Sequence, residues 1–203
     1  MKKVFLIAIV ILNYSCIIAQ QNEIKLISSY SSDNPEISDI LQFEGIEYLK
    51  LNFQGTELVN KTYHLTVKEI WDGKIKSEED IVNSTKLYYE SARKISDSVF
   101  GIKVISKLTH DNKLKMIFKF PEFTINREFD ALDSDDYSLR NIAENNKTII
   151  QTGKKFYLLA YILPYEKDGY KYWCAVEDSG KEIEKWGKEF GIKHYLVFEM
   201  KFE

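Results

Sequence analysis

The amino-acid sequence predicts a mainly β protein, an antiparallel β-sandwich or partly open barrel with one or two short helices. Apolar and polar residues alternate with a period of two in several segments, as in strands that have one face on a core and one in water. Asp-Gly pairs follow two of these segments, and Asp-Gly readily adopts the positive φ angles of tight hairpin loops. Helical periodicity is confined to a few short stretches, which favours sheet packed on sheet.

The alternation is clearest in 63–67, 113–120 and 196–202. In the second segment, for example, apolar residues occupy the even positions and lysines occupy positions 113, 115 and 119. Residues 156–163 are apolar on both faces, which predicts a central strand covered on both sides and ended by Pro164. Weaker alternation predicts further strands at 46–54, 99–107, 123–129 and 170–176. Hairpin turns are predicted at 72–73, 110–112 and 168–169.

Helical signals are few. Apolar residues at helical spacing predict an amphipathic helix over 181–190, with Gly191 as its C-terminal cap. A second short helix is expected around 139–143, after the acidic stretch 133–136. Residues 78–92 fit a helix and an irregular crossover equally well, so both interpretations stay open.

Residues 1–19 are predicted to be a bacterial secretory signal peptide. Two lysines precede a nine-residue apolar run, which is too short to span a bilayer as a helix. Ala19 supplies the small residue that signal peptidase needs before the cut, so one β-rich domain is expected over 20–203. Removal of the segment changes the formal net charge from −3 to −5. This negative charge gives no electrostatic basis for nucleic-acid binding, and a hydrophobic content of 44% excludes a disordered chain.

Cys16 offers an alternative end to the signal segment. Lipoprotein signals end in a box of small residues before a cysteine that becomes lipidated, and of the three residues before Cys16 only Ser15 is small. Lipidation at Cys16 would anchor the mature protein to a membrane, and no membrane contact is expected otherwise. Cys174 is the other cysteine of the sequence, so no disulfide within the domain is expected.

The segment Glu177-Asp-Ser-Gly-Lys181 resembles the Gly-Asp-Ser-Gly-Gly nucleophile loop of chymotrypsin-like serine proteases. The resemblance covers three residues and implies Ser179 as nucleophile, with His64 and Asp111 as base and orienting acid in that family's order. Glu177 and Lys181 replace the glycines that shape the oxyanion loop. The sequence therefore favours a turn that caps the following helix.

Residues 133–144 resemble the calcium loop of EF-hands, with acids at loop positions 1, 3 and 12. Tyr137 replaces a ligand and Ser138 occupies the position where that loop needs glycine, so an acidic helix N-terminus is favoured instead. The three histidines are isolated from one another, and no Gly-rich phosphate loop is present. No metal and no cofactor are therefore predicted.

Aromatic residues are the remaining indication of function. Tyr170, Tyr172 and Trp173 occur together in one predicted strand, and Trp71 adjoins a predicted hairpin tip. Exposed aromatic rings on a sheet stack on sugar rings or anchor a protein partner, whereas buried ones fill a core. Trp71, Tyr170, Tyr172 and Trp173 are therefore the candidate binding residues.

Two hypotheses for function follow. The first is an exported, non-catalytic binding or interaction domain at the cell envelope, periplasmic or extracellular, that binds a protein or a carbohydrate. The alternative is a periplasmic or secreted hydrolase whose carboxylate or histidine pair is assembled from several strands. Two carboxylates about 5–10 Å apart in a deep cleft would favour the hydrolase. Clustered tyrosine and tryptophan rings on a shallow surface would favour the binding domain.

Overall fold

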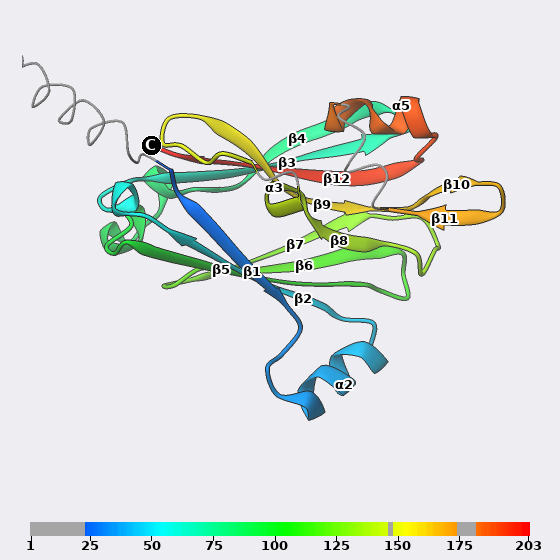
Figure 1. Ribbon diagram of the computed structural model, residues 1–203, viewed down its shortest axis with the longest axis horizontal. Helices are drawn as coiled ribbons and strands as arrows, with labels where there is room; N and C mark the ends of the chain where they lie inside the picture. The colour runs from blue at the N-terminus through cyan, green and yellow to red at the C-terminus, as the bar shows by residue number, and fades with distance from the viewer. Residues whose placement is uncertain (1–22, 146–147, 174–181) are drawn as a thin grey trace, which may run out of the picture.

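The computed structural model describes residues 23–145, 148–173 and 182–203 (Figure 1). The predicted signal peptide, the alternative lipidation site at Cys16, Cys174 and the protease-like loop at Ser179 all lie outside the described residues. Within the described ranges, no helix has the length and apolarity needed to cross a membrane.

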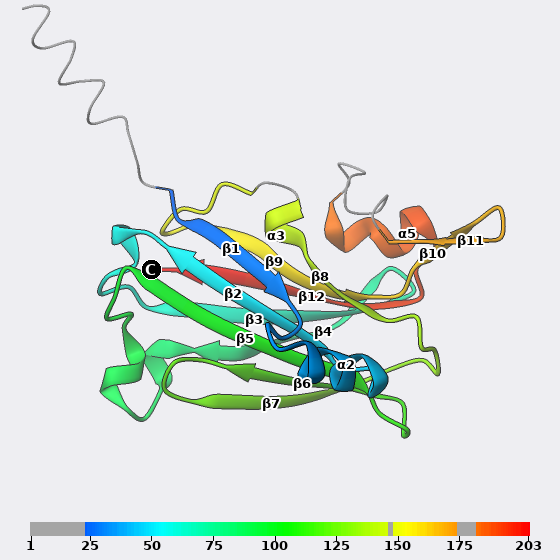
Figure 2. The same cartoon turned by 60° about the horizontal axis from the view of Figure 1, so that its bottom comes forward.

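Two antiparallel five-stranded sheets pack face to face, so the predicted β-sandwich is confirmed (Figure 1, Figure 2). The strands of the first sheet, in spatial order, are β1 (Lys25–Tyr30), β2 (Glu47–Gln54), β5 (Val99–Leu108), β6 (Lys113–Lys119) and β7 (Thr124–Asp130). Those of the second sheet are β4 (Lys74–Asn83), β3 (Tyr63–Trp71), β12 (His194–Phe202), β9 (Lys155–Ile162) and β8 (Ser138–Asn141). Among the described residues no strand of one sheet pairs with a strand of the other, and the barrel is not closed.

The alternation seen in the sequence places the core between the sheets. On β2, Leu49, Leu51 and Phe53 are fully buried, while the residues between them are more exposed. Phe118 of β6 meets Phe198 of β12 with ring centroids 5.4 Å apart, so side chains of both sheets interdigitate. Each such side chain contributes about 1.5–3 kcal/mol when it is fully removed from water.

The strand predicted to be central, 156–163, forms β9, but β12 occupies the centre of its sheet instead. β9 is buried along most of its length, between β12 and the edge strand β8. β12 is buried on both faces because a helical segment covers its outer side. There the Tyr195 hydroxyl donates to the carbonyl of Ile183 (3.0 Å), and its ring lies 6.3 Å from that of Trp186.

The helix predicted over 181–190 is present within the described residues as a 3₁₀ turn, η4 (Ile183–Lys185), followed by α5 (Trp186–Phe190). Gly191 ends it in the left-handed conformation (φ 72°), as predicted. The second predicted helix, α3 (Ile142–Asn145), begins later than expected because residues 138–141 pair with β9 as β8. The acidic stretch 133–136 is therefore a loop and not a helix N-terminus.

Residues 78–92, left open by the sequence, continue β4 and then form two short 3₁₀ turns, η2 (Ser84–Lys86) and η3 (Glu90–Arg93). A further turn, η1 (Thr56–Leu58), follows β2. One helix was not predicted, α2 (Pro35–Phe43), which projects from the first sheet (Figure 1). Its start is specified by local chemistry, because the Asn34 side chain accepts from the N–H of Glu36 (2.9 Å).

Two predicted hairpin turns are formed by Asp-Gly with both residues at positive φ. At the β3–β4 turn the angles are 47° for Asp72 and 70° for Gly73. Asp168 and Gly169 (54° and 78°) join β10 (Tyr165–Lys167) to β11 (Tyr170–Tyr172). These last two strands form a separate ribbon that extends past the end of both sheets (Figure 1).

Side chains connect the sheets along both open sides of the sandwich. On one side, the N–H of Leu139 on the edge strand β8 donates to both carboxylate oxygens of Glu47 on β2 (3.0 and 2.8 Å). On the other side, the Lys76 ammonium of β4 lies 3.2 Å from the Asp130 carboxylate of β7. Arg127 of β7 also reaches two backbone carbonyls of β4, both at 3.4 Å. The sandwich is thus bridged at its edges by polar side chains.

We expect Gly187→Ala to destabilise the contact between α5 and the β3–β4 turn. A Cβ at Gly187 would lie 2.6 Å from the Cα of Gly73, a backbone atom that cannot move aside without displacing the turn. The free energy of unfolding should fall by about 2 kcal/mol, as in other overpacked sites. Urea denaturation followed by circular dichroism measures it.

Gly101→Ala is the matched control. A Cβ there first meets the Asn52 side-chain oxygen at 3.2 Å, and a side chain can rotate away. Equal loss of stability in Gly187→Ala and Gly101→Ala would show that the close approach of α5 to the turn does not matter.

Candidate functional site

The β10–β11 ribbon carries three tyrosines on its two strands. The rings of Tyr165 and Tyr172 are stacked with centroids 5.3 Å apart, and Tyr170 lies 6.5 Å from Tyr172. Tyr170 is 68% exposed and Tyr172 is 38% exposed. We refer to β10, β11 and these three residues as the tyrosine hairpin.

An acidic loop, residues 131–137, holds the base of the tyrosine hairpin. The Trp173 indole N–H donates to the backbone carbonyl of Asp136 (3.2 Å), and the Asp136 carboxylate pairs with the Lys171 ammonium. Trp173 is half-buried and packs against the core. It therefore fixes the position of the hairpin, while Tyr170 and Tyr172 are exposed to solvent.

A cleft of about 600 Å³ lies between the tyrosine hairpin, the acidic loop and the end of α5. Tyr165 and Phe190 supply aromatic lining, and their rings are 5.4 Å apart. Asp133 and Glu166 are exposed carboxylates of the lining. Lys193 adds an ammonium group. The cleft thus combines flat apolar surface with hydrogen-bonding groups of both kinds, as small-ligand sites do.

Trp71 lies apart from the tyrosine hairpin. It ends β3, where its ring stacks on that of His194 with centroids 4.0 Å apart. Its indole N–H donates to the Glu69 carboxylate (2.6 Å), and the Lys76 ammonium lies 5.2 Å from its ring centroid. Of the four aromatic residues predicted from the sequence, the structure therefore brings Tyr170, Tyr172 and Trp173 together, and Trp71 covers a buried histidine.

A buried chain of polar groups joins that histidine to the acidic loop. The Tyr137 hydroxyl lies 2.6 Å from Nδ1 of His194 and accepts from the N–H of Leu132 (3.1 Å). The negative Glu69 carboxylate lies on the Nε2 side of the ring, which favours the tautomer with its proton on Nε2, so that the Tyr137 hydroxyl donates to Nδ1. Nε2 faces the Glu69 carboxylate at 3.8 Å, too far for a hydrogen bond.

Burial determines the ionisation of this pair. It lowers the pKa of His194 to about 4, against the weaker opposing effect of the Glu69 carboxylate. Burial also raises the pKa of Tyr137 to about 12. Both groups are therefore neutral at pH 7, and the Tyr137–His194 bond is a structural link between the acidic loop and β12.

A second cleft, of about 510 Å³, lies on the other side of the acidic loop. Glu47 lines it together with Tyr137 and Tyr161. Burial raises the pKa of the Glu47 carboxyl, although the N–H of Leu139 and the hydroxyl of Ser138 act in the opposite direction. A carboxyl group with a raised pKa in a cleft has the properties of a general acid.

The other candidate motifs take ordinary structural roles where they are described. His64 pairs with Asp80 at 2.6 Å, while Asp111 accepts from the Thr109 hydroxyl (2.6 Å), so the order expected for a protease does not bring them together. The stretch 133–144, which resembles a calcium loop, divides into the acidic loop, β8 and α3. In the described parts of the chain no three His, Cys, Asp or Glu side chains lie close enough to hold a metal ion.

Several residues of this region were not identified from the sequence. Glu47 is one acid among 31, and no spacing marked it as the residue that meets β8. Phe190 was assigned only to the helix core, although it also lines the cleft beside Tyr165. The one available signal was the turn at Asp168-Gly169, which predicts that the strands on either side of it pair and bring their tyrosines together.

Comparisons of this chain with protein-family models, with curated proteins and with solved structures found no match.

The buried His194 predicts a pH-dependent loss of stability. Its folded-state pKa of about 4 is below the usual 6.5, so the unfolded chain binds the proton more readily. The stabilisation is complete above pH 6.5 and is lost as the pH falls from about 6.5 towards 4. We expect the free energy of unfolding to fall by about 2 kcal/mol between pH 7 and pH 5, measured by urea denaturation at each pH.

His194→Gln should remove this pH dependence, whatever its effect on stability at pH 7. His110→Gln, at an exposed position in the β5–β6 turn, is the matched control and should retain it. If His194→Gln keeps the dependence of the original protein, the assignment to His194 is wrong.

Proposed function

We propose that this chain is an exported, non-catalytic binding domain that binds carbohydrate at the tyrosine hairpin. The observation that carries the proposal is the exposure of Tyr170 and Tyr172 on a ribbon beside a cleft lined by carboxylates. Flat aromatic rings stack on the apolar faces of sugar rings. Asp133 and Glu166 line the neighbouring cleft with Tyr165 and would accept from the hydroxyl groups of a sugar residue bound there.

The composition of the cleft favours a carbohydrate over a protein partner. Protein interfaces concentrate apolar anchors at their centre and exclude charge there. The cleft beside the tyrosine hairpin is lined by three charged residues, Asp133, Glu166 and Lys193, together with the rings of Tyr165 and Phe190. A polyhydroxylated ligand suits this lining, because its apolar faces can stack on the rings and its hydroxyl groups can bond to the charged side chains. Each hydroxyl group needs such a hydrogen-bond partner when it leaves water.

The export part of the proposal rests on the N-terminal sequence. The basic start and short apolar run of residues 1–19 support secretion to the periplasm or the exterior. Lipidation at Cys16 is the alternative, and it would hold the domain at a membrane. Either location would give an envelope protein access to extracellular or cell-wall polysaccharide.

We expect the double substitution Tyr170→Ala with Tyr172→Ala to abolish carbohydrate binding without unfolding the domain, because both rings are exposed. Affinity electrophoresis in gels that contain soluble polysaccharides, followed by glycan-array binding, identifies the ligand. Each stacked ring contributes roughly tenfold to affinity. The loss should appear as restored mobility in the gel.

Tyr88→Ala with Tyr89→Ala is the matched control. These two tyrosines are also exposed and in ring contact (5.2 Å), but they lie beside η3, away from the tyrosine hairpin. Retardation that survives the hairpin substitutions, or that is lost equally in both variants, contradicts the proposal. Binding of a protein that requires Tyr170 and Tyr172, with no polysaccharide retained, would replace carbohydrate by a protein ligand.

Hydrolysis is the second candidate function, and the cleft of Glu47 is the observation that favours it. The carboxyl is half-buried, its pKa is raised, and the cleft has room for a ligand. A hydrolase would use Glu47 as general acid. The described lining also contains Asp133 and Asp135, which supply a second carboxylate from the acidic loop.

Glu47→Gln separates the two candidates. The amide oxygen still accepts from the N–H of Leu139, so the sandwich remains bridged, but the group no longer donates a proton in catalysis. A hydrolase acting on glycosides with a sugar or alkyl leaving group, which needs a proton to depart, would lose about a hundredfold or more in kcat. Hydrolysis that proceeds in Glu47→Gln at the rate of the original protein excludes Glu47 as the acid, and a chain without hydrolytic activity supports the binding domain.

A further inference from the structure

The first strand of the sandwich has an open hydrogen-bonding edge. β1 pairs only with β2, and the N–H of Ser31 points to that side because it donates to the carbonyl of Tyr48 (2.7 Å). The N–H of Ile24 points the other way and donates to the carbonyl of Ile150 (2.9 Å). Strand alternation then turns the N–H groups of Leu26 and Ser28 outward, where the described residues offer them no backbone partner.

The other three edge strands are protected against pairing. β4 and β7 carry charged residues along their length and are joined by the Lys76–Asp130 ion pair. β8 is short, and Glu47 accepts from its Leu139 N–H. β1, in contrast, has no charged residue from Leu26 to Tyr30. Side chains of β1 do contact the second sheet, because the Tyr30 hydroxyl accepts from the Asn141 N–H of β8 and the Ser28 hydroxyl donates to Glu144. Its outward N–H groups at Leu26 and Ser28 have no backbone partner among the described residues, so this stretch remains available to another strand.

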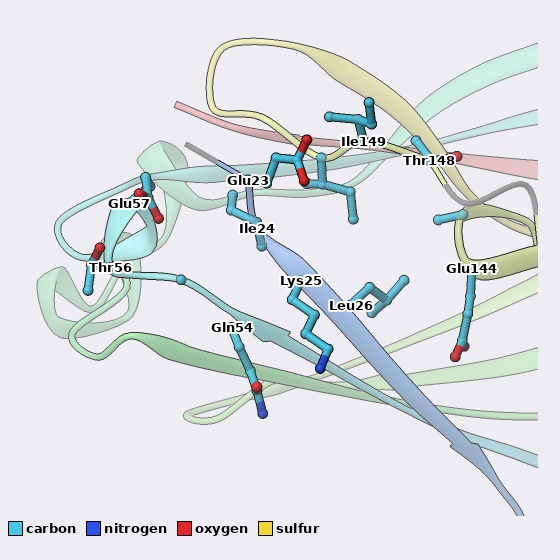
Figure 3. Close-up of a pocket in the computed structure, with 13 residues that line it drawn as sticks. Glu23, Ile24, Lys25, Leu26, Gln54, Thr56, Glu57, Glu144, Thr148 and Ile149 are labelled. Carbon is cyan, nitrogen blue, oxygen red and sulfur yellow. The ribbon is translucent and has the colours of Figure 1, made fainter. Parts of the chain in front are cut away.

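A cavity of about 700 Å³ runs along the start of β1 (Figure 3). Residues 54–57 border it at one end, and the segment that follows β8 borders it at the other. In Figure 3, Ile149 and Thr148 lie on the far side of Glu23 and Ile24 from Thr56 and Glu57. Ile149 is 64% exposed and offers an apolar contact to a strand placed beside β1.

The space beside β1 suits one strand and not a second sandwich. α3 lies over β1, and the Ser28 hydroxyl donates to the Glu144 carboxylate. A second copy paired β1 to β1 about a two-fold axis would bring its own α3 to the same position. The occupant is therefore a single extended segment from another molecule.

Charge defines the chemistry of that segment. The described lining contains three carboxylates, Glu23, Glu57 and Glu144, and one ammonium group, Lys25. Glu144 accepts two hydrogen bonds within the protein, from Ser28 and Asn141, and therefore stays in place. An extended segment that alternates basic and apolar side chains offers partners both to these carboxylates and to the exposed side chain of Ile149.

We propose that the β1 edge is a strand-addition site for an extended, basic peptide segment of a partner protein. Main-chain hydrogen bonds to Leu26 and Ser28 supply affinity, and the carboxylates select basic side chains. This site is separate from the tyrosine hairpin, and its test is independent of carbohydrate binding.

The probe is the synthetic peptide acetyl-Lys-Val-Lys-Ile-Lys-Val-Lys-amide, added to the full domain. Amide hydrogen exchange is followed residue by residue by NMR. We expect exchange at Leu26 and Ser28 to slow by about tenfold on saturation, because each N–H gains a carbonyl partner. The corresponding peptide with glutamate in place of lysine should give no protection.

The double substitution Glu23→Lys with Glu57→Lys should reverse the preference, so that the acidic peptide protects β1 and the basic one does not. Glu78→Lys with Glu79→Lys, on the exposed β4 edge, is the matched control and should leave the preference unchanged. Binding of the basic peptide without protection of Leu26 and Ser28, equal protection by both peptides, or no binding of either overturns the proposal. Protection that appears with protein concentration alone would assign the edge to a second copy instead.

Discussion

Two open sheets have four edge strands, and the rest of this structure depends on how the backbone groups of those edges find hydrogen-bond partners. An edge carries backbone groups that must find partners in water, in side chains or in another chain. Here Glu47 reaches from β2 to the Leu139 N–H of β8, and Lys76 reaches from β4 to Asp130 on β7. These links connect the sheets on both sides without closing a barrel. They also place Glu47 in a cleft. β1 is linked to β8 through the Tyr30 hydroxyl, but the N–H groups of Leu26 and Ser28 have no backbone partner among the described residues.

Polar contacts of the same kind explain the hairpin end of the sandwich. The acidic loop is fixed to β12 by the neutral hydrogen bond between Tyr137 and His194. It is fixed to the hairpin through Asp136, whose carbonyl accepts from the Trp173 indole N–H and whose carboxylate pairs with Lys171. With its base held in this way, the β10–β11 ribbon projects past the sheets and exposes its tyrosines. Trp71 supports the Tyr137–His194 bond, because its ring stacks on His194, whose imidazole is fully buried from water.

Sequence reasoning succeeded where neighbouring residues determine the outcome. The Asp-Gly hairpins, the Gly191 cap and the alternation of β6 are local properties, and each was predicted. The prediction was incomplete where a strand's neighbours are distant in sequence. Nothing in the residues of β9 indicates that β12 occupies the centre of the sheet and that β9 lies next to it. α2 was not predicted although its signals are local: the Asn34 cap and apolar residues at helical spacing, Ile37, Ile40 and Leu41. The candidate site was predicted through Tyr170, Tyr172 and Trp173, which are adjacent along the chain, whereas Glu69, Tyr137 and His194 come together only by folding.

The two proposed sites lie at opposite ends of the long axis of the domain, so attachment at one end would determine where the other site points. The start of β1 is at the end that also holds the C-terminus, and the β10–β11 ribbon of the tyrosine hairpin is at the other end (Figure 1). Cys16 precedes Glu23 closely in the sequence, so a lipid on Cys16 would hold the β1 end near the membrane. The tyrosine hairpin would then lie at the end away from that membrane. A secreted form without the lipid has no such constraint, so the orientation of carbohydrate binding relative to a membrane depends on which residue begins the mature chain.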